Sequence, residues 1–598
     1  MGKKGEKKKI EKMADLLFPI LAVICILPVT VRLTVYNCGY SVYDWYSGND
    51  TITDFYCCAK SSLFFIIGAF ALLILVFFLA FYRERAKGMK SYLPLALYGF
   101  FVVLSTIFSV NIRASWQGNF ESFENCLVLL FYTVISLYAY QMMQEERDYK
   151  IVWYGFLAIT AVMAVIGMFQ VFHHDLMKFP LVQRLLMSAE NYEIYGGEVE
   201  DAFTGNNVYL TLYNPNYAGV FLNMMFAVVF AMFMTELPGK KKILYGVLDG
   251  LLFVLVWYTY SRMALFTVFV TVFLGMFLGG RKEKRKLLCL AAGILALVSA
   301  LAVIDTAAGG RYLGRIIDKN DREPLVSLTT GKESISIVYG RKEENSKELF
   351  PVKYEIFLQG EKLCCRFEGK EIFAEPYEIL KLPVEKESQA YYNEAEGQIL
   401  LSLADTTLSF VREGDGYAYR NFSGKTFSLQ DVEKADFHGL EYLFSARGYI
   451  WSRTFPLLKD HLLQGSGPDT YPEVFPQEDV AGKIVYADNP DRVIEKGHND
   501  YLTKWVQTGG LSVACLLMFY FGVVRKGWQV YGRRKETLAL SGGGAGEGCE
   551  FRSRLGLGCY LGCISFMLSS LTNDSTLQTA PVFWVFTGIL LSVAVHDK

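Results

Sequence analysis

The sequence predicts a polytopic α-helical membrane protein with about twelve transmembrane helices and a large extracytoplasmic loop that contains a β-rich insert. Three observations predict this fold class. The chain has 598 residues, of which 52% are hydrophobic and 15% aromatic, and its mean hydropathy is +0.25. Apolar runs of bilayer-spanning length recur along most of the chain. Clusters of lysine and arginine fall in alternate loops between these runs.

The apolar runs are each about 17–25 residues long, which is enough for a helix to cross a bilayer. They centre on residues 15–34, 62–82, 91–109, 124–142, 151–170, 216–235, 244–260, 263–280, 287–304, 501–524, 555–572 and 580–596. The first run lacks a small-residue cleavage site after it, so we expect it to remain as a helix. With a cytoplasmic N-terminus, every loop assigned inside carries lysine or arginine, as the positive-inside rule requires.

This topology predicts four regions. They are transmembrane helices 1–9 in residues 1–304, an extracytoplasmic β-rich insert in 305–440, an extracytoplasmic helical catalytic loop in 441–500, and helices 10–12 in 501–598 with a cytoplasmic C-terminus. In the insert, Tyr354–Phe367 and Thr407–Arg420 each have strand-forming residues around a glycine-containing turn, which predicts two hairpins. A helical pattern from about Leu443 to Leu463 ends at Gly465-Ser-Gly-Pro468.

Charge and cysteine content exclude some classes of site. The net charge is −1 and the basic residues are spread in small clusters, so we expect no nucleic-acid partner. The twelve cysteines form no metal-binding pattern, and we expect neither a metal nor a cofactor. Cys38 can pair with Cys57 or Cys58 if their loop is extracytoplasmic, and a chance grouping remains the alternative. His438 in the insert has no obvious partner pattern.

Three ionisable residues stand at predicted membrane boundaries on the outer side. His498 precedes the run at 501–524, Arg262 lies in a very short hairpin between two runs, and Arg447 opens the helical stretch of the outer loop. A guanidinium binds two phosphate oxygens at once, and a neutral imidazole accepts a proton from a hydroxyl group. Two arginines and a histidine therefore suit transfer from a pyrophosphate-linked donor to an alcohol.

Simpler interpretations of these residues remain open at this stage. Arginine at a helix end often extends to phospholipid headgroups. His173 and His174 lie at the outer end of another run, which shows that position alone assigns no role to a histidine.

An ordered set of motifs resembles the O-antigen ligase/polymerase family of bacterial membrane glycosyltransferases. The motifs are Leu212-Tyr-Asn-Pro-Asn-Tyr-Ala-Gly219, Tyr260-Ser-Arg-Met-Ala264, Arg447-Gly-Tyr-Ile-Trp451, Gly465-Ser-Gly-Pro-Asp-Thr-Tyr471, and Gly497-His-Asn-Asp-Tyr-Leu502 with Thr508-Gly-Gly-Leu511. Met263 stands where the family usually has glycine, and Gln507 stands where glutamate is common. The resemblance covers most of the chain from about residue 100 onward, excluding the insert.

The resemblance implies a function and roles for particular residues. The donor is a glycan on undecaprenyl pyrophosphate, and the acceptor is a hydroxyl of a glycan, lipid or protein; no metal is required. The enzyme lies in the bacterial cytoplasmic (inner) membrane among membrane lipids, with its active site on the extracytoplasmic side. His498 activates the acceptor, and Arg262 and Arg447 contact the pyrophosphate. Asn214, Asn216, Arg453, Asn499 and Tyr501 are assigned to substrate binding.

Local rules add detail at the histidine. We expect a helix to start near Asn499, whose side chain caps it, with Tyr501 on the face of His498 and lining the pocket. The helix N-terminus favours an anionic pyrophosphate and opposes protonation of the imidazole.

Two other classes of protein compete with a glycosyltransferase. Twelve spans also suit a transporter or flippase of cell-envelope glycolipids, although the predicted spans show no paired half-repeats and carry few charges. The second competing class is a sensor that binds a cell-wall ligand and signals on its cytoplasmic side. However, no predicted cytoplasmic segment is long enough to hold a catalytic domain. The motifs do not separate polymerase from ligase.

Overall fold

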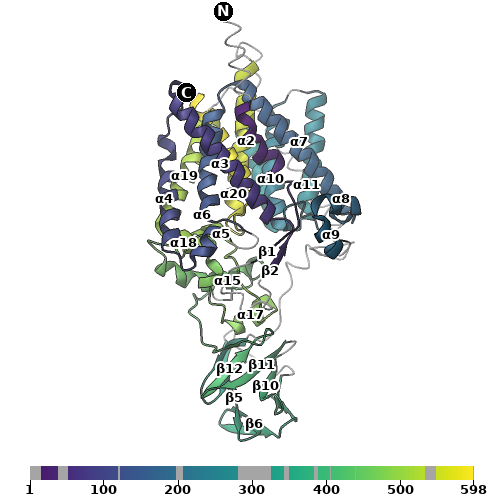
Figure 1. Ribbon diagram of the computed structural model, residues 1–598, viewed down its shortest axis with the longest axis vertical. Coiled ribbons are helices and arrows are strands. Elements are labelled where there is room, and N and C mark those ends of the chain that lie inside the picture. Colours follow the sequence, from purple (N-terminus) through teal and green to yellow (C-terminus); the bar gives the residue numbers. More distant parts are fainter. Residues whose placement is uncertain are drawn as a thin grey trace, which may run out of the picture.

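The computed structural model describes residues 15–37, 51–118, 122–196, 207–236, 238–279, 325–342, 349–382, 388–403, 406–437, 439–532 and 547–596. Most of these residues form a helical bundle (Figure 1). Apart from one small hairpin, the described strands form a lobe, called here the β-lobe (residues 325–427), at one end of the molecule. Helices α15 (Leu443–Asp460) and α17 (Val480–Ala487) lie between the bundle and the β-lobe, and α18 (Asp500–Thr508) lies at the end of the bundle nearest the β-lobe (Figure 1).

Long helices build the bundle. They are α3 (Cys58–Phe81), α4 (Leu93–Ile107), α6 (Cys126–Met142), α7 (Glu146–Val171), α10 (Pro215–Thr235), α11 (Lys240–Tyr258), α12 (Arg262–Gly279), α19 (Gly510–Gly527), α20 (Glu547–Ser569) and α21 (Ala580–His596). Among the described residues, five segments are long and apolar enough to cross a membrane: Cys58–Phe81, Lys90–Ile107, Glu146–Val171, Pro215–Thr235 and Gly510–Gly532. These segments indicate a membrane protein. The full set of twelve stays a prediction, and the run at 287–304 lies outside the described residues.

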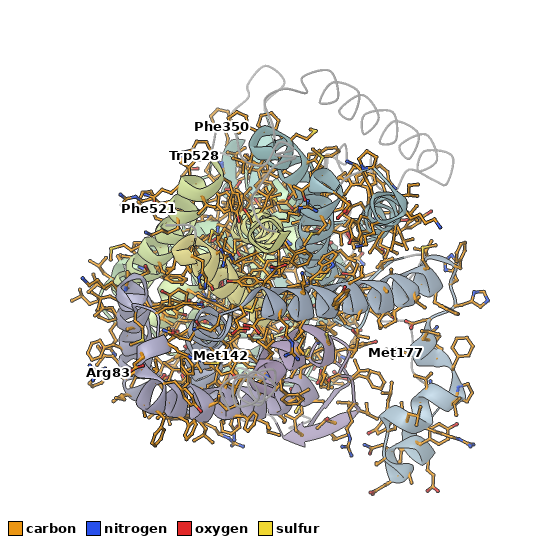
Figure 2. The ribbon with its side chains drawn as sticks, turned by 90° about the horizontal axis from the view of Figure 1, so that it is seen from above. Arg83, Met142, Met177, Phe350, Phe521 and Trp528 are labelled. Carbon is orange, nitrogen blue, oxygen red and sulfur yellow. The ribbon has the colours of Figure 1, made fainter. Side chains whose placement is uncertain are left out.

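The bundle has a packed interior and an apolar exterior. Every residue of α10 from Tyr217 to Met232 is buried, so this helix lies at the centre. In the view from above, Phe521 and Trp528 lie at the outside of the bundle, whereas Met142 lies further in (Figure 2). Their exposed fractions are 68%, 43% and 2%. Large exposed apolar side chains on a helical exterior are what lipid contact requires.

Two predicted spans are wrong in their extent. The run at 15–34 is helical only through Asp15–Ile26, in three short pieces that include α2 (Phe18–Leu21), because Pro28 cannot donate to a continuing helix. The chain then enters strand β1 (Thr34–Asn37), which pairs antiparallel with β2 (Thr51–Asp54).

The run at 501–524 is two helices rather than one. Helix α18 (Asp500–Thr508) ends at Gly509, where φ is +95°, and α19 begins at Gly510. A hydropathy window does not detect such a break, because it depends on one backbone angle. The N–H of Gly510 donates to the carbonyl oxygen of His461 at 3.0 Å, so the break is also where the outer loop contacts the bundle.

Short helices and the longer α15 (Leu443–Asp460) lie towards the end of the bundle that carries the β-lobe. The short ones are α5 (Ile112–Gln117), α8 (Pro180–Leu186), α9 (Ala189–Tyr195), α16 (Tyr471–Val474) and α17 (Val480–Ala487). Helix α15 covers most of the stretch predicted as helical, and it ends before the Gly465–Pro468 break as expected.

Two antiparallel sheets form the β-lobe. One has the order β3-β4-β5-β6-β7, and the other has the order β13-β12-β11-β10-β9-β8. The strands are β3 (Leu325–Thr330), β4 (Ile335–Lys342), β5 (Leu349–Gln359), β6 (Lys362–Phe367), β7 (Lys370–Ala374), β8 (Ile379–Lys381), β9 (Gln389–Asn393), β10 (Gln398–Leu403), β11 (Thr406–Glu413), β12 (Gly416–Arg420) and β13 (Thr426–Phe427). Both predicted hairpins are confirmed as β5–β6 and β11–β12.

The core of the β-lobe is completed by residues that follow it in the chain. Val480, Val485 and Val493, from α17 and the segment after it, are buried in the same apolar cluster as the strands. The β-lobe therefore supports the segment that leads directly to His498, although the lobe boundary predicted at residue 440 left α17 outside it.

We predict that removing residues 325–429 with a short linker destabilises the segment from 471 to 496. Three valine side chains then lose their apolar partners, at a cost of about 1.5–3 kcal/mol each. Limited proteolysis of the membrane-inserted protein measures the effect as faster cleavage in that segment. A companion deletion with Val480, Val485 and Val493 changed to serine should restore part of the resistance. Equal resistance of the simple deletion and the intact protein would show that the contact is unimportant.

Candidate functional site

His498 is positioned by the start of α18. The side-chain oxygen of Asn499 accepts a hydrogen bond from the N–H of Leu502 at 3.1 Å, which confirms the predicted cap. The backbone on the other side of His498 is also fixed, because Trp451 Nε1 donates to the Gly497 carbonyl oxygen at 2.9 Å. The imidazole therefore projects from a constrained loop at the helix N-terminus, and 38% of its side chain is exposed.

The imidazole is paired with a carboxylate that the sequence did not reveal. Nδ1 of His498 lies 2.9 Å from Oδ2 of Asp574, in the loop between α20 and α21. The other oxygen, Oδ1, accepts from the hydroxyl of Thr503 at 3.1 Å. A neutral imidazole that donates from Nδ1 to a carboxylate leaves Nε2 as the acceptor for a proton. This arrangement suits a general base.

Asp574 is the electrostatic centre of the site. Its side chain is only 4% exposed. Burial raises the pKa of Asp574, but its pairing with His498 and the charges of Lys496 and Arg447 bring it below the ordinary value. Asp574 is therefore a carboxylate at neutral pH.

Arg447 approaches the same loop from α15. Its Nη2 donates to the side-chain oxygen of Asn573 at 3.2 Å, and in the described part of the chain it has no ion pair. The pKa of the Arg447 guanidinium is lowered by burial, which is the largest influence. The charges of Asp574 and Tyr217 raise this pKa, and the charge of Arg262 lowers it. The contact with Asn573 places the guanidinium beside the loop that carries Asp574. A partly buried guanidinium whose described partner is one amide oxygen is well suited to an anion.

Arg262 comes from the first residue of α12, and its side chain is exposed. Helices α10 and α12 approach closely beside it. A Cβ on Gly219 would lie 2.6 Å from that of Ala264, so only glycine allows this packing. Asn223 Nδ2 also donates to the carbonyl oxygen of Ala264 at 2.7 Å. The close approach brings the start of α12 beside the Asn-Pro-Asn motif of α10.

The Asn-Pro-Asn motif begins α10 and leads to the site through Tyr217. Asn214 caps the helix by accepting from the N–H of Asn216 at 2.9 Å. One residue later, the Tyr217 hydroxyl accepts from Nζ of Lys496 at 3.1 Å, and this ammonium lies 5.5 Å from the ring centroid. Lys496, which is two residues before His498 and 4% exposed, thus joins α10 to the segment that leads to His498.

Left-handed backbone occurs in four of the segments that build the site. His498 itself has a φ of +47°, Tyr213 and Tyr260 have +70° and +53°, and the three residues before Arg447 have +54° to +64°. Non-glycine residues adopt this region rarely, at a cost on the order of 1–3 kcal/mol each. Such conformations cluster at functional sites, where packing maintains them.

The remaining predicted binding residues have partners within the fold. Arg453 pairs with Asp479 at 2.8 Å in a buried contact and lies 4.6 Å above the Tyr449 ring, so its described contacts are not with the His498 group. Asn499 Nδ2 donates to the Leu571 carbonyl oxygen at 2.9 Å, and the Tyr501 hydroxyl donates to that of Met567 at 2.8 Å. His498 precedes the helix, so Tyr501 does not share a helical face with it.

Sequence reasoning missed Asp574, Asn573, Tyr217 and Lys496. A signal existed for the first two, since Thr572-Asn573-Asp574-Ser575 is a polar run between two apolar ones on the predicted outer side. Lys496 lay in the motif segment beside the histidine. None of these signals indicated which residues meet.

No metal centre is found in the part of the chain that the structure describes, where no group of three histidine, cysteine, aspartate or glutamate side chains is placed to hold an ion. The possible pairing of Cys38 cannot be assessed, because Cys38 lies outside the described residues, as does His438. No protein-family model matches the chain, and no curated protein sequence matches it.

Proposed function

We propose that this chain is a membrane glycosyltransferase that transfers a glycan from undecaprenyl pyrophosphate to a hydroxyl acceptor, as in O-antigen ligases and polysaccharide polymerases. The observation that carries the proposal is the His498–Asp574 pair beside Arg447, with Nδ1 and Oδ2 2.9 Å apart. A base and an anion-binding group in one site are what this reaction needs. The motif resemblance supports the same class.

The proposed reaction assigns one task to each group. The acceptor oxygen bonds to the anomeric carbon as the bond from that carbon to the pyrophosphate oxygen breaks. Nε2 of His498 takes the acceptor proton and later releases it to water. Asp574 stabilises the imidazolium, while Arg447 and Arg262 stabilise the negative charge that develops on the departing undecaprenyl pyrophosphate. The residues of this chain supply every proton transfer in this step.

The proposed location follows from the donor. A lipid-linked glycan presents its pyrophosphate at the membrane surface, and the site lies where the bundle meets the β-lobe (Figure 1). With the cytoplasmic N-terminus that the loop charges predict, this end is extracytoplasmic in a bacterial inner membrane. The acceptor class, whether glycan, lipid or protein hydroxyl, is left to the assay.

One observation favours the alternative of a glycolipid transporter or flippase. Asp249 is buried within α11, and neither of its carboxylate oxygens has a hydrogen-bond partner among the described residues. Intramembrane carboxylates often serve transport pathways. A glycolipid transporter would not explain the paired His498 and Asp574 beside Arg447, and we therefore prefer the glycosyltransferase.

Reconstitution of the purified protein in liposomes tests the function. With an undecaprenyl-pyrophosphate glycan and an acceptor, we expect a new glycosidic bond and free undecaprenyl pyrophosphate. A matched monophosphate donor should react about 10–100-fold more slowly, because it loses charge-assisted hydrogen bonds worth about 1.5–3 kcal/mol. Movement of the intact donor across the bilayer, without a new bond, would instead identify a transporter.

A further inference from the structure

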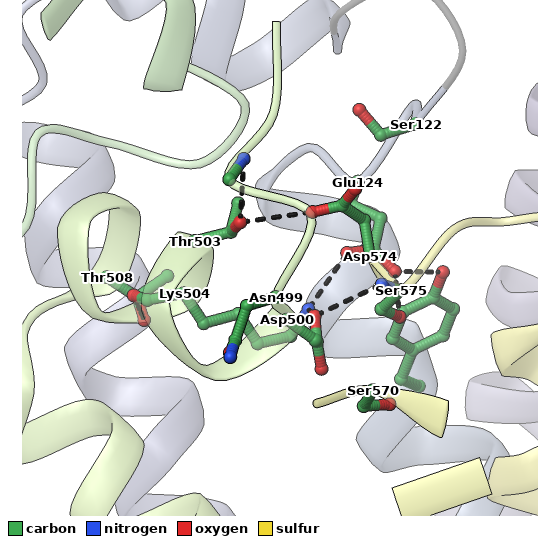
Figure 3. Close-up of polar contacts among 12 residues, drawn as sticks. Ser122, Glu124, Asn499, Asp500, Thr503, Lys504, Thr508, Ser570, Asp574 and Ser575 are labelled. Atoms are coloured by element: carbon green, nitrogen blue, oxygen red, sulfur yellow. Dashed lines mark hydrogen bonds and ion pairs between the residues drawn. The ribbon is translucent and has the colours of Figure 1, made fainter. Parts of the chain in front are cut away.

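A buried lysine joins the segments around the site. Nζ of Lys504 lies 2.9 Å from Oε2 of Glu124 and 2.6 Å from Oδ1 of Asp500. The exposed fractions of the three side chains are 4%, 6% and 2%. Glu124 precedes α6, whereas Asp500 and Lys504 belong to α18, so the ammonium links two elements far apart in sequence (Figure 3).

Both carboxylates also hold the loop that carries Asp574, called here the Asp574 loop (residues 570–579). The Ser575 hydroxyl donates to Oε1 of Glu124 at 2.5 Å, and the Ser575 N–H donates to Oδ1 of Asp500 at 3.3 Å. The N–H of Asp500 donates in turn to the carbonyl oxygens of Ser570 and Asn573 at 2.9 and 3.2 Å. Lys504 is thus the cation shared by the two carboxylates that bind this loop.

Loss of the ammonium would act directly on this loop. Two buried carboxylates would then lie close together without their shared cation, which is strongly unfavourable. One carboxylate then takes up a proton, or Glu124 or Asp500 moves, and either response alters the hydrogen bonds that both side chains accept from Ser575, the residue after Asp574. The 2.9 Å contact between Asp574 and His498 depends on this position.

We propose that Lys504 is a positioning residue that fixes the Asp574 loop and thereby holds Asp574 against His498. This inference rests on the proposed transferase function. Lys504 is too deeply buried to contact substrate, and it acts through Glu124, Asp500 and Ser575 (Figure 3).

Kinetics of Lys504→Met, Asp574→Asn and the double variant test the inference. Each single change should lower kcat by about 10–100-fold, the usual effect of losing a group that orients a catalytic residue. The KM for the donor should stay within about twofold, because the proposed donor contacts come from other residues. The double variant should be no slower than the slower single variant, since both changes break the same link. The proposal would be overturned if the kcat losses of the two single changes multiplied in the double variant, or if Lys504→Met kept full kcat.

A matched control separates this effect from the general cost of losing a buried lysine. Lys87 is 9% exposed, and its Nζ donates to Ser592 Oγ and to the carbonyl oxygens of Tyr140 and Met143, at the far end of α6. Lys87→Met should leave kcat unchanged in the folded fraction. Lys504→Arg is the companion if Lys504→Met does not fold. It keeps the charge, but its larger planar guanidinium does not fit the closely packed space between Glu124 and Asp500 without displacing them. It should therefore lose kcat without a change in donor KM, and an unchanged kcat would count against the proposal.

Hydrogen exchange provides a readout that does not depend on activity. Amides of residues 570–579 should exchange at least about tenfold faster in Lys504→Met, and at the normal rate in Lys87→Met. If the wild type transfers no glycan but this exchange difference appears, the proposed function fails while the link from Lys504 to the loop stands. If activity requires His498 and Asp574 but the loop exchanges normally in Lys504→Met, the positioning role fails alone.

Discussion

His498→Ala should lower kcat for glycan transfer by about 10²–10⁴-fold, the usual contribution of a positioned general base. An acceptor hydroxyl is a poor nucleophile until its proton is being removed, and Nε2 is the ring atom that Asp574 leaves available. Binding of the donor should stay within about twofold, because the proposed pyrophosphate contacts come from Arg262 and Arg447. Single-turnover kinetics and donor titration with the purified protein measure the two quantities separately.

His174→Ala is the matched control for this change. His174 is exposed just after the C-terminus of α7, and among the described residues its Nδ1 contacts one carbonyl oxygen, that of Phe172, at 2.6 Å. The His174→Ala variant should transfer glycan at the normal rate. Near-normal turnover in His498→Ala would remove this histidine from the mechanism.

Arg447→Lys should lower kcat/KM for the donor by about 10–100-fold, equivalent to one or two charge-assisted hydrogen bonds of about 1.5–3 kcal/mol. Lysine keeps the charge but loses the planar group that engages two phosphate oxygens. The effect should be large at Arg447 because its guanidinium is partly buried, with Asn573 as its described hydrogen-bond partner. We expect a smaller effect in the same direction for Arg262→Lys, since its side chain is exposed to water.

The control for the arginine series is Arg366→Lys on strand β6. Arg366 forms exposed ion pairs with Glu355 and Glu371 and has no role in the proposed site. It should change neither donor affinity nor turnover. If Arg447→Lys and Arg262→Lys both retained full activity, bidentate binding of pyrophosphate would be the wrong account, and contact with lipid headgroups would explain the two arginines better.

Much of the local structure could be predicted because its causes are local. The caps of α10 and α18 depend on Asn214 and Asn499 bonding to an N–H two or three residues later. The hairpins β5–β6 and β11–β12 depend on Gly360 and Gly414, whose φ values are +65° and +58°. Such contacts involve neighbouring residues, so sequence patterns reveal them.

The predictions of helix extent and of the β-lobe boundary were wrong where one residue or one distant contact decides the structure. The helices predicted at 15–34 and 501–524 were inferred from apolar composition alone. That criterion takes no account of Pro28 or of the left-handed turn at Gly509. The boundary of the β-lobe was misplaced because α17 supplies part of its core from a later part of the chain.

The sequence by itself determined the membrane class, the helical pattern, the β-rich insert and three chemically suitable residues, His498, Arg262 and Arg447. Only the tertiary structure decided which groups meet: Asp574 reaches His498 across 76 positions of sequence, and Lys504 reaches Glu124 across 380. The physical reason is that hydropathy and capping act over a few residues, whereas a buried charge is stable only beside a partner that packing brings to it. The site is therefore a property of how the helices pack.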